Sequence, residues 1–214
     1  EKVHPGSIAA YLLLGLCACT QGPASPAPSA PSFDSARAWK DLEKLVALGP
    51  RQSGTPGAEA TRLYIEQELL AVGLKPVRES FTQATPAGDI AFANVYVDLT
   101  PKDQGKDWIL FCAHYDTKRM PFNFVGANDA GSGTALLLEL ARSLAQRPAG
   151  KFGYRLVFLD GEESVNERWV DPDNRYGSRH HAKRLRETGR VSNFKACVLF
   201  DMIGDKHLMM YREV

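Results

Sequence analysis

Three short apolar runs, each followed at once by an acidic or histidine side chain, restrict the fold of this chain more than any other feature. The runs are Trp108–Ala113, Tyr154–Leu159 and Ala196–Phe200. Each has the length and continuity of a buried strand, and Ala130–Ala145 between the first two has the pattern of a helix. Strands that alternate with helices indicate an α/β fold with a mixed, mostly parallel sheet and helices on both faces.

Further elements follow from capping and breaking residues. Asp34–Leu48 and Thr55–Val72 are predicted to be helices, because each begins at a residue that caps helices and is followed by glycine. Tyr176–Glu187 is a third predicted helix, and Ile90–Leu99 has the composition of a strand. In the first helix we expect apolar side chains, Trp39 among them, to form the inner face.

Composition excludes several classes of protein. The 214 residues are 44% apolar and 24% charged, which is typical of a soluble globular domain. Lys and Arg number 26 against 25 Asp and Glu, so no excess of positive charge indicates a nucleic-acid partner. The length predicts one domain, which we expect to be a monomer. Cys112 and Cys197 fall in predicted strands, where we expect buried thiols; a disulfide between them is the alternative.

The N-terminal segment is expected to lie outside the fold. Its apolar run Ile8–Leu16 is too short to cross a bilayer and is typical of a secretory signal. The residues that follow resemble the lipobox of bacterial lipoproteins, with Cys19 as the lipidated residue. We therefore expect a signal peptide over 1–19, a Pro/Ser-rich linker over 20–33 and the folded domain over 34–214. The protein would be exported, either periplasmic or held at a bacterial membrane only through a lipid anchor; an ordinary cleaved signal is the alternative.

The side chains that follow the predicted strands are expected to meet. Ligands of open parallel sheets bind outside the carboxyl ends of the strands, so residues at these ends converge. Histidine and carboxylates bind zinc, and a carboxylate that is not a ligand can act as a base. Each motif alone also fits a solvated turn or a helix cap, but together they predict a metal site. The converging residues are His114, Asp116, Asp129, Asp160, Glu162, Glu163 and Asp201.

Three motifs resemble those of metallopeptidase family 28, which includes bacterial zinc aminopeptidases and the glutaminyl-peptide cyclotransferases. They are His114–Lys118 (HYDTK), Phe124–Asp129 (FVGAND) and Phe158–Glu163 (FLDGEE). The resemblance covers about residues 45–205 and implies a sheet of the zinc exopeptidase type. Ala130–Gly133 is more similar to the aminopeptidases. Four other stretches are closer to the cyclotransferases: Pro50–Gly54, Trp169, Tyr176–His180 and Asp201–Gly204.

The resemblance also implies roles for individual residues. Asp129 and Glu163 correspond to zinc ligands in both branches, and Glu162 corresponds to the general acid and base. A cyclotransferase would hold one zinc ion, with Asp201 in the hydrogen-bond network around the reacting groups. An aminopeptidase would hold two, with His114 and Asp201 as additional ligands and Asp129 as the bridge. The number of zinc ions therefore separates the two readings.

The implied substrates are the N-termini of peptides or proteins. A cyclotransferase converts N-terminal Gln to pyroglutamate and releases ammonia, whereas an aminopeptidase hydrolyses the first peptide bond. Asp116 would orient His114, and Trp169 would form a wall of the substrate pocket. A non-catalytic family member is a further alternative. The last metal ligand of the family is a histidine well downstream of Asp201, so we expect a chain that ends at Val214 to be an incomplete catalytic domain without the final strands.

Overall fold

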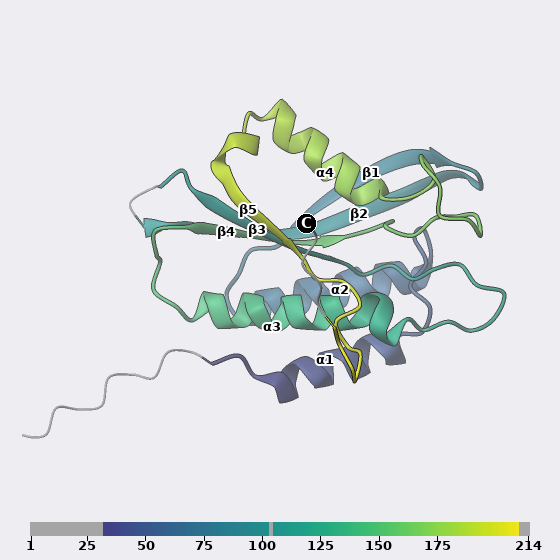
Figure 1. Cartoon of the computed structure of the whole chain (residues 1–214), viewed down its shortest axis with the longest axis horizontal. Helices are drawn as coiled ribbons and strands as arrows, with labels where there is room; N and C mark the ends of the chain where they lie inside the picture. Colours follow the sequence, from purple (N-terminus) through teal and green to yellow (C-terminus); the bar gives the residue numbers. More distant parts are fainter. Residues whose placement is uncertain (1–31, 103–104, 210–214) are drawn as a thin grey trace, which may run out of the picture.

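A mixed five-stranded sheet forms the centre of the computed structural model, which describes residues 32–102 and 105–209 (Figure 1). The strand order is β1-β2-β4-β3-β5. β1 with β2 and β2 with β4 pair antiparallel, whereas β3 pairs parallel with both β4 and β5. The predicted mixed α/β class is thus confirmed, and the parallel pairs are in the half that carries the acidic motifs. The strands are β1 (Val77–Thr85), β2 (Gly88–Leu99), β3 (Trp108–His114), β4 (Gly153–Leu159) and β5 (Phe194–Leu199).

Helices cover both faces of this sheet. In Figure 1, α1, α2 and α3 lie on one side and α4 on the other. Asp34 caps α1 by accepting a hydrogen bond from the Arg37 amide, and Thr55 caps α2. A π-helical turn, η2 (Ala127–Ser132), leads into α3, and a short 3-10 turn, η3 (Val191–Asn193), precedes β5. The helices are α1 (Ser35–Ala47), α2 (Pro56–Ala71), α3 (Gly133–Ala145) and α4 (Tyr176–Glu187).

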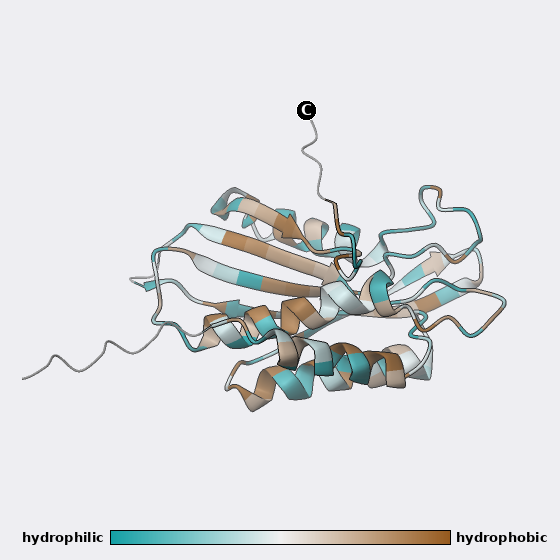
Figure 2. Ribbon diagram, turned by 60° about the horizontal axis from the view of Figure 1, so that its bottom comes forward, coloured by the Kyte–Doolittle hydropathy of each residue, from teal (hydrophilic) through white to brown (hydrophobic). Residues whose placement is uncertain are grey.

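The main core lies between the sheet and helices α2 and α3. Leu137 and Leu138 of α3 are completely buried against the central strands, with Phe158 of β4 among their neighbours. Each such side chain contributes about 1.5–3 kcal/mol relative to remaining exposed. The apolar colour in Figure 2 runs along the central strands, whereas α1 and α2 alternate between apolar and polar residues. The core therefore fixes the parallel strands whose ends carry the acidic residues.

Two strands differ from expectation. Strand β1 was not predicted, because its residues are mostly polar and exposed. It is held by pairing with β2 across the turn at Pro86 and Ala87. The run expected as a buried strand, β5, is instead largely exposed, since it pairs on one side, with β3. Accordingly Cys197 is exposed while Cys112 is buried, and both are free thiols with their sulfurs 4.0 Å apart. An apolar sequence alone does not separate an edge strand from a central one.

Helix α1 buries Leu45 as expected, with Leu42 and Val46 half-buried, but Trp39 does not join this inner face. Trp39 is 61% exposed, and its indole Nε1 donates a hydrogen bond to Glu43. The buried face consists of Ala38, Asp41 and Leu45. Asp41 is directed inward because Arg142 of α3 binds its carboxylate, with distances of 2.5 and 3.0 Å. The ion pair thus accounts for the acidic side chain on the buried face of this helix.

Predictions for the N-terminal segment are not tested by the structure. The signal peptide and lipobox over 1–19, and most of the linker over 20–33, lie outside the described residues. Within the described ranges, no helix is long and apolar enough to cross a bilayer.

Candidate metal centre

The ends of strands β3 and β5 and the turn η2 bring three metal-binding side chains together. His114 is the last residue of β3, Asp129 is in η2, and Asp201 follows β5. His114 Nε2 lies 3.1 Å from Asp129 Oδ1 and 3.5 Å from Asp201 Oδ1. One ligand atom from each residue lies within 4.8 Å of the others, which is close enough for all three to contact one ion.

The position of Asp201 depends on η2. The Ile203 amide donates to Ser132 Oγ at 3.1 Å, and the Gly204 amide donates to Asn128 Oδ1 at 2.8 Å. These bonds join the segment after β5 to the turn that carries Asp129. Neither Ser132 nor Asn128 was predicted to have this role, because it depends on contacts across more than 70 residues of chain.

Unpaired polar atoms mark the inside of this site. His114 Nδ1 and Asp129 Oδ1 are buried, and neither has a hydrogen-bond partner. Such atoms are rare in folded proteins and call for an explanation such as a bound ion. Burial disfavours a charged imidazole, yet the nearby carboxylates of Asp116, Asp129 and Asp201 raise the pKa of His114 well above its ordinary value. The site therefore attracts positive charge, and an imidazole with several carboxylates is a donor set that fits zinc.

Asp116 connects the end of β3 to the acidic turn after β4. Its two carboxylate oxygens accept hydrogen bonds from the backbone amides of Glu162 and Glu163, at 3.0 and 3.1 Å. Asp116 Oδ1 also lies 3.5 Å from His114 Nδ1. The predicted contact by which Asp116 would orient His114 is therefore long. The hydrogen bonds by which Asp116 holds the Glu162–Glu163 turn were not predicted.

The two glutamates of this turn have raised pKa values. Burial and the nearby carboxylates raise the pKa of Glu163 to about 7. Burial also raises the pKa of Glu162, with Asp116 and Asp201 contributing and His114 opposing. Carboxyl groups that resist ionisation in this way indicate an excess of negative charge that a bound cation would relieve.

Hydrogen bonds from Lys118 and Arg175 hold the loop that contains Trp169 in place. The Lys118 ammonium donates to Ser164 Oγ, and also to the carbonyls of Ser164 and Asn166 at 2.9 and 2.7 Å. At the other end, the Arg175 amide donates to the Glu162 carbonyl at 2.9 Å. Trp169 itself is half-exposed, with the Arg175 guanidinium 5.1 Å from its ring centroid. It is accessible to a ligand, as a pocket-wall residue must be.

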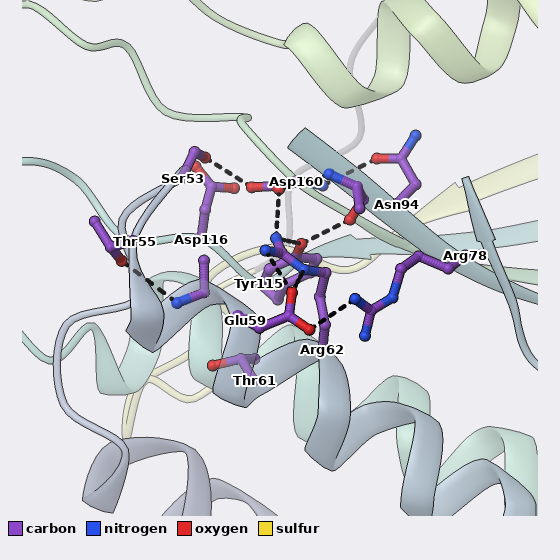
Figure 3. Close-up of polar contacts among 12 residues, drawn as sticks. Ser53, Thr55, Glu59, Thr61, Arg62, Arg78, Asn94, Tyr115, Asp116 and Asp160 are labelled. Carbon is purple, nitrogen blue, oxygen red and sulfur yellow. Dashed lines mark hydrogen bonds and ion pairs between the residues drawn. The ribbon is translucent and has the colours of Figure 1, made fainter. Parts of the chain in front are cut away.

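Asp160 does not join the metal-binding cluster. Its carboxylate accepts hydrogen bonds from Ser53 Oγ at 2.7 Å, and from Arg62 and the Ala93 amide at 2.9 Å each (Figure 3). Arg62 also donates to the Tyr115 hydroxyl. Asp160 therefore anchors the end of β4 to α2 and β2, one residue before the acidic turn begins. This role depends on partners distant in the sequence, and no local signal indicates it.

This fold and this cluster of histidine and carboxylates define a metallopeptidase-type domain, and the comparisons agree. Residues 94–211 match the family model described as "Peptidase family M28". The chain therefore belongs to peptidase family M28, and the resemblance inferred from its motifs is confirmed.

Within this family, the chain is similar to glutaminyl-peptide cyclotransferases. The chain is 34% identical over 197 residues to a glutaminyl-peptide cyclotransferase-like protein of Bos taurus, covering 84% of this chain and 50% of the relative. It is 32% identical over 198 residues to a glutaminyl-peptide cyclotransferase of Gloydius blomhoffii, covering 80% and 52%. The chain thus spans about half the length of the curated relatives it matches.

Solved structures show the same relationship. A glutaminyl cyclase from an Acidobacteriales bacterium superimposes with a TM-score of 0.79 at 35% identity, covering 90% of this chain and 67% of that one. A Zn-dependent exopeptidase from Parabacteroides distasonis has a TM-score of 0.70 at 26% identity, covering 83% and 64%. The predicted fold of the zinc exopeptidase type is confirmed by these neighbours.

Proposed function

We propose that this chain forms the metal-binding part of a zinc-dependent glutaminyl-peptide cyclotransferase, which converts an N-terminal Gln to pyroglutamate and releases ammonia. The observation that carries the metal site is the cluster at the sheet edge, where His114 Nδ1 and Asp129 Oδ1 lack hydrogen-bond partners beside Asp201. The similarity to cyclotransferases and glutaminyl cyclases supports the choice of reaction.

Asp129 and Glu163 would hold the zinc ion, and in this reaction His114 and Asp201 would complete the surrounding hydrogen-bond network. The ion would act as a Lewis acid toward the γ-carbonyl of the substrate Gln. Glu162 is held beside Glu163 by Asp116, and it would accept the proton of the attacking α-amine and deliver it to the departing ammonia. The half-exposed Trp169 would contact the substrate.

One observation favours the aminopeptidase as a second candidate. The three side chains that come within reach of one ion are His114, Asp129 and Asp201, which include both residues that would be ligands only in a centre with two zinc ions. The similarity to the Zn-dependent exopeptidase supports the same candidate. In that reaction Glu162 would take a proton from a water molecule that attacks the first peptide bond.

Mass spectrometry of two peptides that differ only in their first residue, Gln or Leu, separates the candidates. We expect the Gln peptide to become lighter by one ammonia in the presence of zinc, and the Leu peptide to remain intact. Removal of the first residue from either peptide would contradict the cyclotransferase and support the aminopeptidase. No change in either peptide, although zinc binds, would support the non-catalytic alternative.

The role of Glu162 is tested by the variant Glu162→Gln. We expect turnover to fall by about 10²–10⁴-fold, because a general acid and base contributes that much. Zinc content, measured by atomic absorption, should remain unchanged. Glu167→Gln is a suitable control, since it alters another carboxylate of the same loop. Wild-type turnover in Glu162→Gln would exclude the assigned role.

A further inference from the structure

Arg51 is a buried cation that has backbone carbonyls rather than carboxylates as its partners. Its side chain is 0% exposed. Nε donates to the Tyr115 carbonyl at 3.0 Å, and Nη2 donates to the Gly126 carbonyl at 2.9 Å. Nη1 donates to the Val125 carbonyl at 2.6 Å, and it also lies 3.2 Å from the carbonyl of Leu45. The guanidinium thus contacts three separate segments of chain.

Two of these segments carry the proposed metal-binding residues. Tyr115 stands between His114 and Asp116, and Gly126 directly precedes the turn η2 that contains Asp129. The third segment is the end of α1, where the Leu45 carbonyl accepts a hydrogen bond from the guanidinium. Arg51 therefore ties the end of β3 and the start of η2 to the same rigid part of the molecule.

The backbone around Arg51 strengthens this connection. The Arg51 amide donates to Thr117 Oγ1 at 2.9 Å, and the Thr117 amide lies 3.4 Å from the Arg51 carbonyl. Gly126 has φ +52°, and a Cβ there would lie 2.6 Å from Thr117 Cγ2 and 2.2 Å from the Asp129 carbonyl oxygen. The close contact among these segments thus requires glycine at this position, and it places the Gly126 carbonyl where Arg51 can bind it.

A simple ion pair does not account for this arginine. Among the described residues, no carboxylate lies within ion-pair distance of Arg51, unlike Arg62 or Arg142. Burial lowers its pKa to about 10, while the charges of Asp116 and Asp129 act in the opposite direction, so the group is positively charged at neutral pH. An unpaired buried charge is destabilising unless its hydrogen bonds are well satisfied. Three of the bonds that satisfy this one lead to backbone carbonyls around the site, at Tyr115, Val125 and Gly126.

We propose that Arg51 is the positioning residue of the metal centre, whose guanidinium sets the spacing between the end of β3 and the turn that carries Asp129. This proposal rests on the proposed metal site, but the rigidity it predicts does not require the metal. A planar guanidinium donates in several fixed directions, whereas an ammonium does not, so lysine at this position would keep the charge and lose the geometry.

The decisive measurement is hydrogen exchange, followed by peptide mass spectrometry, on metal-free wild-type protein and Arg51→Lys. We expect exchange in peptides that cover residues 117–132 to become at least about tenfold faster in the variant, because several hydrogen bonds to a charged group are lost. Arg155→Lys is the matched control, since Arg155 is also buried but binds Asp98 elsewhere on the sheet. It should leave exchange in this segment unchanged.

Cobalt binding provides the second readout. In Arg51→Lys we expect affinity for Co²⁺ to fall about 10–100-fold, as is typical when a residue that supports metal ligands is lost. The visible spectrum of bound Co²⁺ should also change. Thr117→Val, a milder variant, should speed exchange over 117–132 in the same direction by a smaller factor.

Wild-type exchange over 117–132 in both Arg51→Lys and Thr117→Val would overturn the proposal. So would faster exchange accompanied by wild-type Co²⁺ affinity and spectrum, since Arg51 would then have only a structural role. If the wild-type protein binds no metal, the proposed function fails, and the exchange measurement still decides whether Arg51 fixes the two segments.

Discussion

Two clusters of carboxylates in this molecule differ in whether arginine side chains balance their negative charge. Between the helices, the arginine-paired cluster consists of Arg37, Asp41, Glu68, Glu139 and Arg142, where Arg142 contacts all three carboxylates. At the end of the parallel strands, the sheet-edge cluster consists of His114, Asp116, Asp129, Glu162, Glu163 and Asp201. No arginine forms an ion pair with this second cluster in the described part of the chain, and its ion pair with Lys118 is long, at 4.0 Å.

The pKa values reflect this difference. Burial acts to raise the pKa of Glu139, but hydrogen bonds from Arg37 and Arg142 bring it below its ordinary value. Burial and neighbouring carboxylates instead raise the pKa of Glu163 to about 7. The comparison indicates that carboxylates paired with arginine stabilise the fold, whereas a group of carboxylates without arginine favours binding of a cation. Three predictions test it, in order of decreasing expected effect.

Removing the central arginine of the arginine-paired cluster should destabilise the folded protein strongly. Arg142→Met leaves Asp41 and Glu139 with fewer partners in a buried place, and loss of one member of a buried ion pair costs about 3–5 kcal/mol. Urea denaturation would measure this loss in the free energy of unfolding. Arg78→Met, at a more exposed pair, should cost less than about 1 kcal/mol. Equal losses in the two variants would contradict the comparison.

Removing one acid from the sheet-edge cluster should weaken metal binding without destabilising the metal-free protein. Asp129→Asn is expected to weaken zinc binding by more than about 100-fold, beyond the usual effect of losing an outer partner of a ligand. The stability of the metal-free protein should not fall, because one source of repulsion is removed. Calorimetric titration with zinc measures the affinity. Asp107→Asn is the control, since Asp107 is a half-exposed carboxylate at the opposite end of β3. Unchanged affinity in Asp129→Asn would place the metal elsewhere.

A comparison of Glu163→Gln with Glu139→Gln should show opposite dependence on pH. The pKa of Glu163 in the folded, metal-free protein is about 7, above the ordinary value of 4.5. Its contribution to stability is therefore complete below pH 4.5 and is lost as the pH rises through 7. At pH 8 we expect Glu163→Gln to be more stable than the wild type by about 1–2 kcal/mol, and to match it at pH 4.

Glu139 has a lowered pKa, so its contribution is present above the ordinary value and is lost on acidification. Glu139→Gln should accordingly be less stable than the wild type at pH 8, with a difference that shrinks toward acid pH. Thermal unfolding at several pH values in the presence of a chelator would measure both variants. If Glu163→Gln were destabilised at pH 8 without zinc, the sheet-edge cluster would not be a cation site.

Much of the fold was predictable because its signals are local. Caps at Asp34 and Thr55 begin two helices as expected, and the continuous apolar run of β4 is buried. The polar strand β1 and the exposed face of β5 were not predicted, since each depends on which strand lies beside it. The burial of Asp41 beside Arg142 was not predicted either, since no periodicity reveals this pairing.

The sequence by itself determined that acids and a histidine end neighbouring strands, and that their motifs belong to peptidase family M28. The tertiary structure alone decided how these acids are divided. It directs Asp160 toward Arg62 and away from the metal centre, and it leaves His114 and Asp129 with unpaired atoms. It also places Arg51 between the two segments of the site. The physical reason is that charge is balanced through space, between residues that are far apart in the chain.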